Sequence, residues 1–452
     1  MKHQNPSTSS GCGLKLTLSI VFVCVISFAG AQVVTTLAGA SIAGKTDGTG
    51  AEAHFNAPYG VVADGRGNLF VADYNNNEIR KIVISTGVVS TFAGTTKAGF
   101  ADGIGTAASF NGPAGITTDG RGNLYVADLI NTEIRKIVIS SGVVTTLAGS
   151  TAAGAADGTG SAASFYYPSG VVADGNGNLY VSDGYNNEIR KIVISTGVVT
   201  TLAGTIAGGH ANGTGTAASF NGPRGIAMDR DGNLYVADFD NNEIRKIVVS
   251  SGVVTTLAGS VIAGSADGIG TSAKFDYPIG VAIDRNNNLY VGDENNNEIR
   301  KIVISSGVVT TLAGSTVAGS ADGTRAAASF YYPTGITIDE SGNLYVADLS
   351  NNEIRKVTAP IISIAQFSVL NSQLTIYPYH ANQMVYVKLP EPVQCATSIK
   401  VLDVMDKEVM TVNNTVCDDK EMSLDISGLA PGIYFIRVTS DNAARAIKFV
   451  KE

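Results

Sequence analysis

Short apolar runs, separated by turn-forming residues, follow one another along most of the chain. Between residues 58 and 93 four such runs are expected to form strands, at 60–63, 68–72, 78–85 and 88–93. Gly, Asn and Asp stand between these runs and favour tight turns, because they tolerate positive φ or hydrogen-bond their own backbone. Since short loops join antiparallel neighbours, the pattern predicts a four-stranded antiparallel sheet and little helix.

These runs are apolar at successive positions, as in the Leu-Tyr-Val-Ala segment at 124–127. A sheet with one face in water alternates apolar and polar residues, whereas a sheet covered on both faces is apolar throughout. We therefore expect each sheet to be buried on both faces.

The four-run pattern returns six times between residues 33 and 357, always 55 residues apart. A proline before the first run and an aspartate after the second mark this period: Pro58, Pro113, Pro168, Pro223, Pro278 and Pro333, and Asp73, Asp128, Asp183, Asp238, Asp293 and Asp348. A fixed period is typical of repeat architectures. Because both faces of each sheet need cover, the pattern predicts an all-β, six-bladed β-propeller over residues 32–358.

The two ends of the repeat array complement each other. Residues 33–39 form a fourth run with no first three before it, and residues 353–357 form a third run with no fourth after it. Their pairing is predicted to complete the sixth blade and close the ring through about five backbone hydrogen bonds, each worth about 1 kcal/mol. An open solenoid would need capping repeats instead.

Each copy also carries four short motifs, which in the third copy are PSGVVAD at 168–174, GNLYVSD at 177–183, NEIRK at 187–191 and VVTTLAG at 198–204. These motifs resemble the NHL repeat. The resemblance covers all six copies and implies an NHL-type propeller. Such propellers mostly bind and occasionally catalyse, so the resemblance implies a scaffold and no single activity.

Residues 1–31 have the features of a secretory signal peptide: Lys2, Lys15, an apolar run at 16–28, and small residues before a cleavage site near Ala31. The apolar run is shorter than the about 20 residues of a membrane span. We therefore expect an exported chain with no transmembrane segment in its mature form. A nucleic-acid partner is not expected, because the net charge is −8 and phosphate binding depends on clustered Lys and Arg.

After Val357 the period stops, and residues 359–372 are expected to link the propeller to a small Ig-like β-sandwich at 373–452. Its strands are predicted at 374–377, 385–389, 399–404, 423–426, 432–439 and 446–450. The sequence LDISGLAPGIYFIRV at 424–438, with KFVK at 448–451, resembles the C-terminal sorting domain of type IX (Por) secretion substrates. The resemblance implies a protein that the type IX machinery recognises through residues 373–452 and that is secreted or attached to the outer-membrane surface. An accessory sandwich without a sorting role is the alternative.

Cys395 and Cys417 are the cysteines that remain once the signal peptide is removed. They flank strands of an exported module, and disulfides persist in such surroundings. A disulfide between them and a pair of free thiols are both open.

Features that recur in all six copies are expected to maintain the blade. The Asp-Asn loop at 73–77 lacks the Gly and distal Glu of a calcium EF-hand, so we interpret it as a turn. Glu78 and Arg80 are expected to form ion pairs within or between blades. The recurring Asp-Gly loops are expected to cap one helical turn, at 161–165 in the third copy, with these N-caps: Asp47, Asp102, Asp157, Asn212, Asp267 and Asp322.

Features that differ between copies are the candidates for ligand binding, and aromatic residues dominate them. The connection into the first strand and the loop between the second and third strands lie on the same face of a four-stranded blade. Aromatic rings with polar tips suit sugar or protein binding, although any one of them could instead pack against a loop helix. The predicted ligand-binding residues are Tyr59, Tyr74, Tyr166, Tyr167, Tyr185, Arg224, Phe239, Tyr277, Tyr331 and Tyr332.

Arg224 is the one basic residue at a position that is otherwise Tyr59, Ala114, Ser169, Ile279 and Thr334. We expect it at the mouth of the central channel, where a guanidinium could hold a carboxylate in bidentate fashion.

Three functions are open for the propeller. The first is a secreted or surface-displayed binding or scaffold protein whose aromatic face engages a glycan, peptide or protein. The second is an extracellular enzyme of the lyase or lactonase type. The propeller offers only His54 and His210 and no Cys, so a three-His zinc site cannot form, and neither a metal nor another cofactor is expected. The third is a structural or adhesive surface protein.

Overall fold

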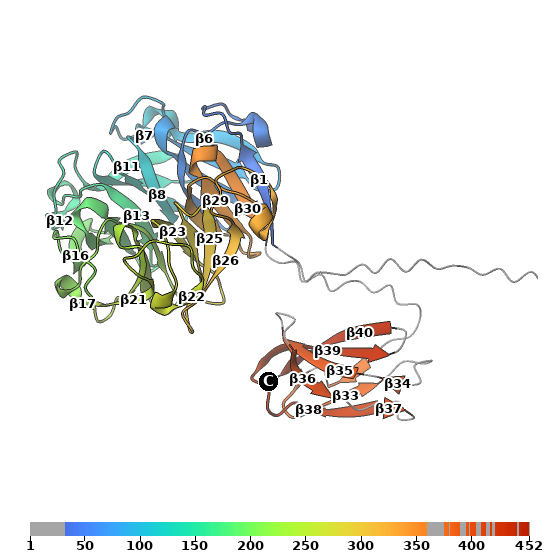
Figure 1. Cartoon of the computed structure of the whole chain (residues 1–452). Coiled ribbons are helices and arrows are strands. Elements are labelled where there is room, and N and C mark those ends of the chain that lie inside the picture. Colours follow the sequence, from blue (N-terminus) through green and yellow to red (C-terminus); the bar gives the residue numbers. More distant parts are fainter. Residues whose placement is uncertain are drawn as a thin grey trace, which may run out of the picture. The chain divides into compact units, whose positions relative to one another are not determined.

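The computed structural model describes residues 32–358 and, further along the chain, residues 375–378, 380–388, 395–396, 398–403, 408–412, 416–417, 421–440 and 443–451. The predicted signal peptide and linker lie outside these residues. The described chain forms two compact units, one within Ala31–Ile361 and one within Ile362–Glu452 (Figure 1). Among the described residues, none of the helices has the length and hydropathy needed to cross a bilayer.

The first unit consists of six antiparallel sheets, the blades of a β-propeller (Figure 1). The first strand of each blade lies beside the first strand of the next blade, and β28 lies beside β3. These innermost strands are β3 (Pro58–Ala63), β8 (Pro113–Thr118), β13 (Pro168–Ala173), β18 (Pro223–Met228), β23 (Pro278–Ile283) and β28 (Pro333–Ile338).

Three further strands follow outward in every blade. The second strands are β4 (Asn68–Asp73), β9 (Asn123–Asp128), β14 (Asn178–Asp183), β19 (Asn233–Asp238), β24 (Asn288–Asp293) and β29 (Leu344–Asp348). The third strands are β5 (Glu78–Val83), β10 (Glu133–Val138), β15 (Glu188–Val193), β20 (Glu243–Val248), β25 (Glu298–Val303) and β30 (Glu353–Val357). The fourth strands are β6 (Val88–Gly94), β11 (Val143–Gly149), β16 (Val198–Gly204), β21 (Val253–Gly259), β26 (Val308–Gly314) and, from the start of the described chain, β1 (Val33–Gly39).

The predicted pairing between the two ends of the repeat array is present. Strand β1 runs antiparallel to β30, with Val34 opposite Val357 and Gly39 opposite Glu353. The sixth blade therefore takes its fourth strand from the beginning of the described chain and its other long strands from the end of the array.

Each blade has a fifth strand that the sequence pattern did not predict. It has two residues and pairs with the fourth strand: β2 (Gly48–Thr49), β7 (Gly103–Ile104), β12 (Gly158–Thr159), β17 (Gly213–Thr214), β22 (Gly268–Ile269) and β27 (Gly323–Thr324). The predicted helical turn is a 3-10 turn that begins directly after this strand: η1 (Gly50–Glu52), η3 (Gly105–Ala107), η4 (Gly160–Ala162), η6 (Gly215–Ala217), η8 (Gly270–Ser272) and η9 (Arg325–Ala327). Four blades have a second 3-10 turn between the second and third strands: η2 (Tyr74–Asn76), η5 (Gly184–Asn186), η7 (Phe239–Asn241) and η10 (Leu349–Asn351).

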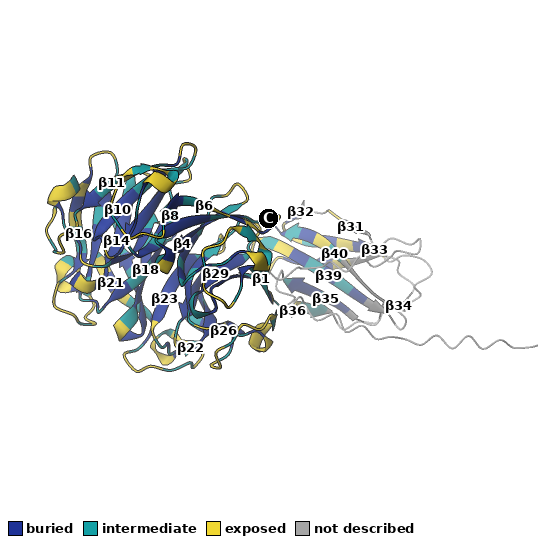
Figure 2. Cartoon of the chain, turned by 90° about the horizontal axis from the view of Figure 1, so that it is seen from above, coloured by how far each residue is buried: buried dark blue, intermediate teal, exposed yellow. Residues whose placement is uncertain are grey.

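The blades are buried on both faces, as their apolar runs predicted. Successive residues of β9 show this, because Leu124 packs with Phe70 of the preceding blade and Tyr125 packs with Phe165 of the following one. Figure 2 shows the result, with buried strands inside the propeller and exposed loops at its edges. The core is thus a series of apolar layers between blades.

The second unit is a small β-sandwich. One sheet contains β31 (Thr375–Tyr377), β33 (Met384–Lys388) and β38 (Glu421–Asp425), and the other contains β32 (His380–Ala381), β40 (Ala443–Lys451), β39 (Gly432–Ser440), β35 (Ser398–Asp403) and β36 (Glu408–Val412). Residues of both sheets, among them Val385 and Ile436, share one apolar core.

A two-stranded sheet of β34 (Cys395–Ala396) and β37 (Val416–Cys417) completes the second unit. Its register places Cys395 opposite Cys417. A disulfide between the two stays a prediction.

Candidate ligand-binding site at the channel mouth

One fully buried arginine recurs in every blade and shows what the repeated charges do: Arg80, Arg135, Arg190, Arg245, Arg300 and Arg355. In the first blade the Arg80 guanidinium donates to Asp73 Oδ2 at 2.9 Å and to Asp47 Oδ1 at 2.6 Å. It also lies 5.3 Å from the centre of the Phe55 ring. The ion pairs are within the blade, and the predicted partner Glu78 is further away, at 3.9 Å.

The predicted N-cap role of the recurring aspartates is wrong. No side chain caps the 3-10 turn that follows them, because the Asp47 carboxylate instead accepts hydrogen bonds from Arg80 and, at 3.2 Å, from Thr91. The partners are 33 and 44 residues apart in sequence. A local sequence pattern suggested a helix cap, but folding of the blade places the Arg80 guanidinium, which is distant in sequence, beside this carboxylate.

The Asp-Asn loops are hydrogen-bonded turns, as interpreted from the sequence. Asp73 Oδ1 accepts the backbone N–H of Asn56 at 2.8 Å, and its Oδ2 accepts from Asn76 as well as from Arg80. Asn77 adopts a left-handed φ of 55°, and its Oδ1 accepts the N–H of Gly112 in the next blade at 2.9 Å. Across the described chain, no cluster of three His, Cys, Asp or Glu side chains is arranged to hold a metal.

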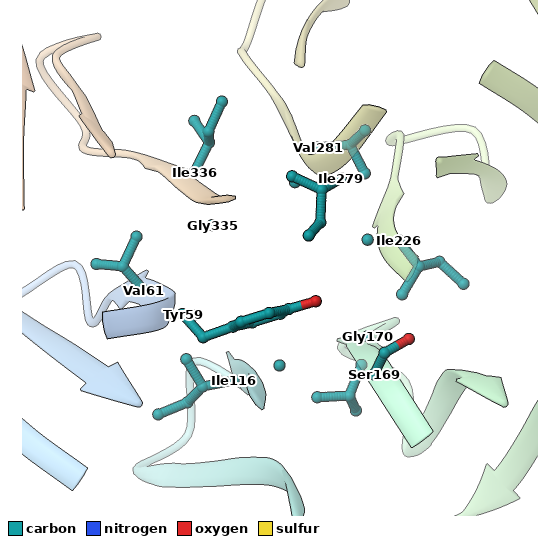
Figure 3. Close-up of a pocket in the computed structure, with 15 residues that line it drawn as sticks. Tyr59, Val61, Ile116, Ser169, Gly170, Ile226, Ile279, Val281, Gly335 and Ile336 are labelled. Carbon is teal, nitrogen blue, oxygen red and sulfur yellow. The ribbon is translucent and has the colours of Figure 1, made fainter. Parts of the chain in front are cut away.

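The central channel is apolar and narrow. Each blade contributes one β-branched residue to the wall: Val61, Ile116, Val171, Ile226, Val281 and Ile336. A glycine precedes each of them, because a Cβ at Gly225, for example, would stand 2.1 Å from the carbonyl oxygen of Ile279 in the neighbouring strand. The cavity holds about 70 Å³, and Figure 3 shows the Tyr59 ring crossing it. The channel is therefore too narrow to hold a group of more than a few atoms.

The structure brings most of the predicted aromatic residues together in groups on the face that carries this mouth. The backbone N–H of Tyr185 donates to the carbonyl of Tyr166 at 3.0 Å, which joins the two variable connections of one blade. The ring pairs, with centroid distances, are Tyr59–Tyr74 (5.9 Å), Tyr166–Tyr167 (5.3 Å), Tyr166–Tyr185 (5.1 Å), Tyr167–Tyr185 (4.5 Å), Phe239–Tyr277 (4.5 Å) and Tyr331–Tyr332 (4.8 Å). Tyr185 is 52% exposed and Tyr277 36% exposed, so rings in this set are available to a ligand.

These groups form one surface around part of the ring, which we call the aromatic mouth: Tyr59, Tyr74, Tyr166, Tyr167, Tyr185, Phe239 and Tyr277. The Tyr74 ring extends over Gly112 of the second blade, since a Cβ there would meet it at 2.9 Å. Burial raises the pKa of Tyr74, and the phenols of Tyr167 and Tyr185 act on it in the same direction. Tyr331 and Tyr332 make a separate pair in the sixth blade.

Arg224 lies within this surface. Its guanidinium is 5.0 Å from the centre of the Phe239 ring. The positive charge of Arg224 also acts on the hydroxyl of Tyr59, which comes from the opposite blade. No carboxylate among residues 32–358 comes within 4.0 Å of the guanidinium. Arg224 is partly exposed, in contrast to the six repeated arginines. Burial raises the pKa of Tyr59 to about 12, so this hydroxyl keeps its proton at neutral pH.

Glu294 is a residue of this site that the predicted set does not contain. Burial raises its pKa to about 7, the positive charge of Arg224 opposes that rise, and the carboxylate of Asp276 adds to it. One of its carboxylate oxygens is buried without a hydrogen-bond partner among the described residues. The sequence signal is modest, because Glu294 is the one charged residue at a position occupied elsewhere by Tyr74, Leu129, Gly184, Phe239 and Leu349.

Two family descriptions match this chain. The NHL repeat matches residues 165–192, 220–247, 275–302 and 330–357. The secretion system C-terminal sorting domain matches residues 375–452.

Curated relatives align with the propeller part. Protein SUPPRESSOR OF QUENCHING 1, chloroplastic, of Arabidopsis thaliana is 29% identical over 304 residues, which are 64% of this chain and 29% of that protein. NHL repeat-containing protein 2 of Bos taurus is 28% identical over 341 residues, which are 68% of this chain and 47% of that protein. The chain thus spans less than half the length of either relative.

Solved structures share the fold. A Bacteroides thetaiotaomicron protein of unknown function is 24% identical, with a TM-score of 0.56 and coverage of 73% of this chain and 76% of that one. An auxiliary nutrient binding protein of the same species is 19% identical, with a TM-score of 0.55 and coverage of 73% and 77%. The sorting domain indicates secretion or cell-surface attachment through the type IX system. The chain carries NHL repeats in a six-bladed β-propeller and ends in a secretion system C-terminal sorting domain, as its sequence predicted.

Proposed function

We propose that the exported propeller is a binding protein that holds an extracellular ligand on the aromatic mouth, while the C-terminal domain serves its export. One observation carries this proposal. Side chains that differ between copies lie together at one end of the channel, whereas the repeated charged side chains form ion pairs with one another inside the blades. A purely structural propeller has no need of exposed rings there, because exposed apolar surface in a folded protein commonly marks an interaction site.

The fold neighbours support a binding role without naming a ligand. One of them is an auxiliary nutrient binding protein, and it shares the propeller architecture at 19% identity. Tyr and Phe rings offer a large contact area at low entropic cost, which suits a surface that captures ligands.

The proposal is tested by probing the full exported chain against arrays of oligosaccharides and of peptides. The variant Tyr277→Ala is compared with Tyr386→Ala, which alters a tyrosine of similar exposure in the sorting domain, 37% against 36%. We expect Tyr277→Ala to lose the array signal and Tyr386→Ala to keep it, with both variants melting like the parent. A chain that binds no array member, or whose signal survives Tyr277→Ala, would end the proposal.

A further inference from the structure

The centre of the aromatic mouth holds an arginine and a glutamate from adjacent blades. Arg224 lies in β18 and Glu294 directly follows β24. The backbone N–H of Glu294 donates to the carbonyl of Tyr277 at 3.3 Å. The Phe239 ring lies between the two groups, 4.5 Å from the Tyr277 ring and 5.0 Å from the Arg224 guanidinium. Neither Arg224 nor Glu294 has a counterpart of the same chemistry in another copy.

The balance of charge at this centre disfavours an anionic ligand. Arg224 faces Glu294 and Asp240, and Glu294 also faces Asp276. A ligand carboxylate that approached the guanidinium would meet carboxylates of like charge. The sequence suggested that Arg224 could hold a carboxylate, and the oligogalacturonate in the test below examines that hypothesis.

The same centre disfavours a cationic ligand. The face of Phe239, where a ligand cation would be attracted by the ring, is occupied by the Arg224 guanidinium at 5.0 Å. A second cation would also be repelled by Arg224. A ligand without net charge avoids both the repulsion by these carboxylates and the repulsion by Arg224.

The hydrogen-bonding groups at this centre restrict the chemical class of the ligand further. A guanidinium only donates hydrogen bonds and a carboxyl group accepts them, whereas a hydroxyl group does both. Neighbouring hydroxyls on one sugar ring are thus able to accept from Arg224 and donate to Glu294 together. The apolar face of the same ring can stack on the exposed ring of Tyr277, which lies against Phe239.

We propose that the ligand of the aromatic mouth is a neutral oligosaccharide whose hydroxyls bridge Arg224 and Glu294 while its ring faces stack on Tyr277 and Tyr185. This inference rests on the proposed function and specifies its ligand class. Arg224 is oriented for binding before a ligand arrives, because its guanidinium lies over the Phe239 ring and interacts with Tyr59.

The test uses the full exported chain on an array that carries maltohexaose, cellohexaose, mannohexaose, xylohexaose, oligogalacturonate, a lysine-rich peptide and a proline-rich peptide. Members that bind are then titrated by calorimetry with the parent, with Glu294→Gln, and with Glu340→Gln. Glu340 is the matched control, because its side chain is 71% exposed in the loop between β28 and β29, away from the channel mouth.

We expect binding to at least one neutral hexaose, at least about tenfold weaker in Glu294→Gln and unchanged in Glu340→Gln. Affinity should also stay constant between about 0.01 M and about 1 M salt, because charge attraction is screened over that range and hydrogen bonding to a neutral ligand is not. Preference for oligogalacturonate, or tighter binding in Glu294→Gln, would overturn the inference. Binding of a peptide alone would also overturn it but leave the proposed function standing, and no binding at all would defeat both.

Discussion

Arg190 and Arg224 are 34 residues apart, and each places its guanidinium over a phenylalanine ring, at 5.4 and 5.0 Å. Arg190 is fully buried and ion-paired at 2.8 Å with Asp183 and at 2.7 Å with Asp157. Arg224 is partly exposed and forms no ion pair with a carboxylate among residues 32–358. The repeated arginine thus stabilises its blade, whereas the single arginine forms no ion pair, and we propose that its donors serve a ligand.

The largest effect should come from removing residues 32–40. This deletion takes away β1, its pairing with β30, and the buried side chains of Val34 and Ala38. At about 1 kcal/mol for each of about five backbone hydrogen bonds, we expect the free energy of unfolding to fall by about 5 kcal/mol or more. Thermal melting followed by circular dichroism checks this against a chain that starts at Gln32, and an unchanged melting temperature would refute closure by β1.

The two arginines provide the next contrast. Arg190→Ala leaves Asp183 buried without its cation, so we expect a loss of about 3–5 kcal/mol in the free energy of unfolding. Arg224→Ala removes a partly exposed side chain and should cost less than about 1 kcal/mol. Urea unfolding of both variants measures the two losses in the free energy of unfolding. Equal losses would contradict the different roles assigned to the two arginines.

A smaller effect should appear in the pH dependence of stability. Burial raises the pKa of Glu133, Glu298 and Glu353 to about 7, from the usual 4.5. The folded state therefore binds more protons than the unfolded state between these values, and its stability falls as the pH rises from 4.5 to 7.

We expect the urea midpoint to be higher at pH 5 than at pH 8. Replacing these three glutamates by glutamine should reduce that slope, and the rest should remain because burial also raises the pKa of Asp73 and Asp128 to about 6. A midpoint that rises with pH over this window would show that the repeated glutamates are stabilised in their charged form.

The smallest effect concerns the fourth blade, where Asn212 replaces the aspartate of the other copies. Its Oδ1 accepts from Arg245 at 2.9 Å, while Asp157 in the third blade forms an ion pair with Arg190. Because such an aspartate is half exposed, Asn212→Asp should add less than about 1 kcal/mol, and Asp157→Asn should remove a similar amount. Paired urea titrations compare the two changes, and effects of the same sign would contradict the equivalence of the blades.

Much of the fold could be predicted because strand and turn chemistry is local and the period repeats it six times. The strands at 60–63 and 68–72 lie within β3 and β4, and the incomplete ends identified β1 as the partner of β30. The two-residue fifth strands could not be predicted, because two residues carry no periodic signal.

The candidate site was predictable only in part. Variation between copies identified the aromatic residues, and the short connections that carry them lie on one face of each blade. The role of Asp47 depends on a cation 33 residues away, and that of Glu294 on an arginine in another blade. Such contacts follow from how the blades pack, which no local pattern in the sequence contains.

The most direct test of the central claim is hydrogen–deuterium exchange of the full exported chain with and without the oligosaccharide that binds it on the array. If ligand binding belongs to the positions that differ between copies, protection should concentrate in the segments at 165–185, 221–241 and 276–296. The Ser-Gly and Thr-Gly turns at the other end of the blades should exchange as before. Equal protection in all six copies, or protection at those turns, would contradict the account.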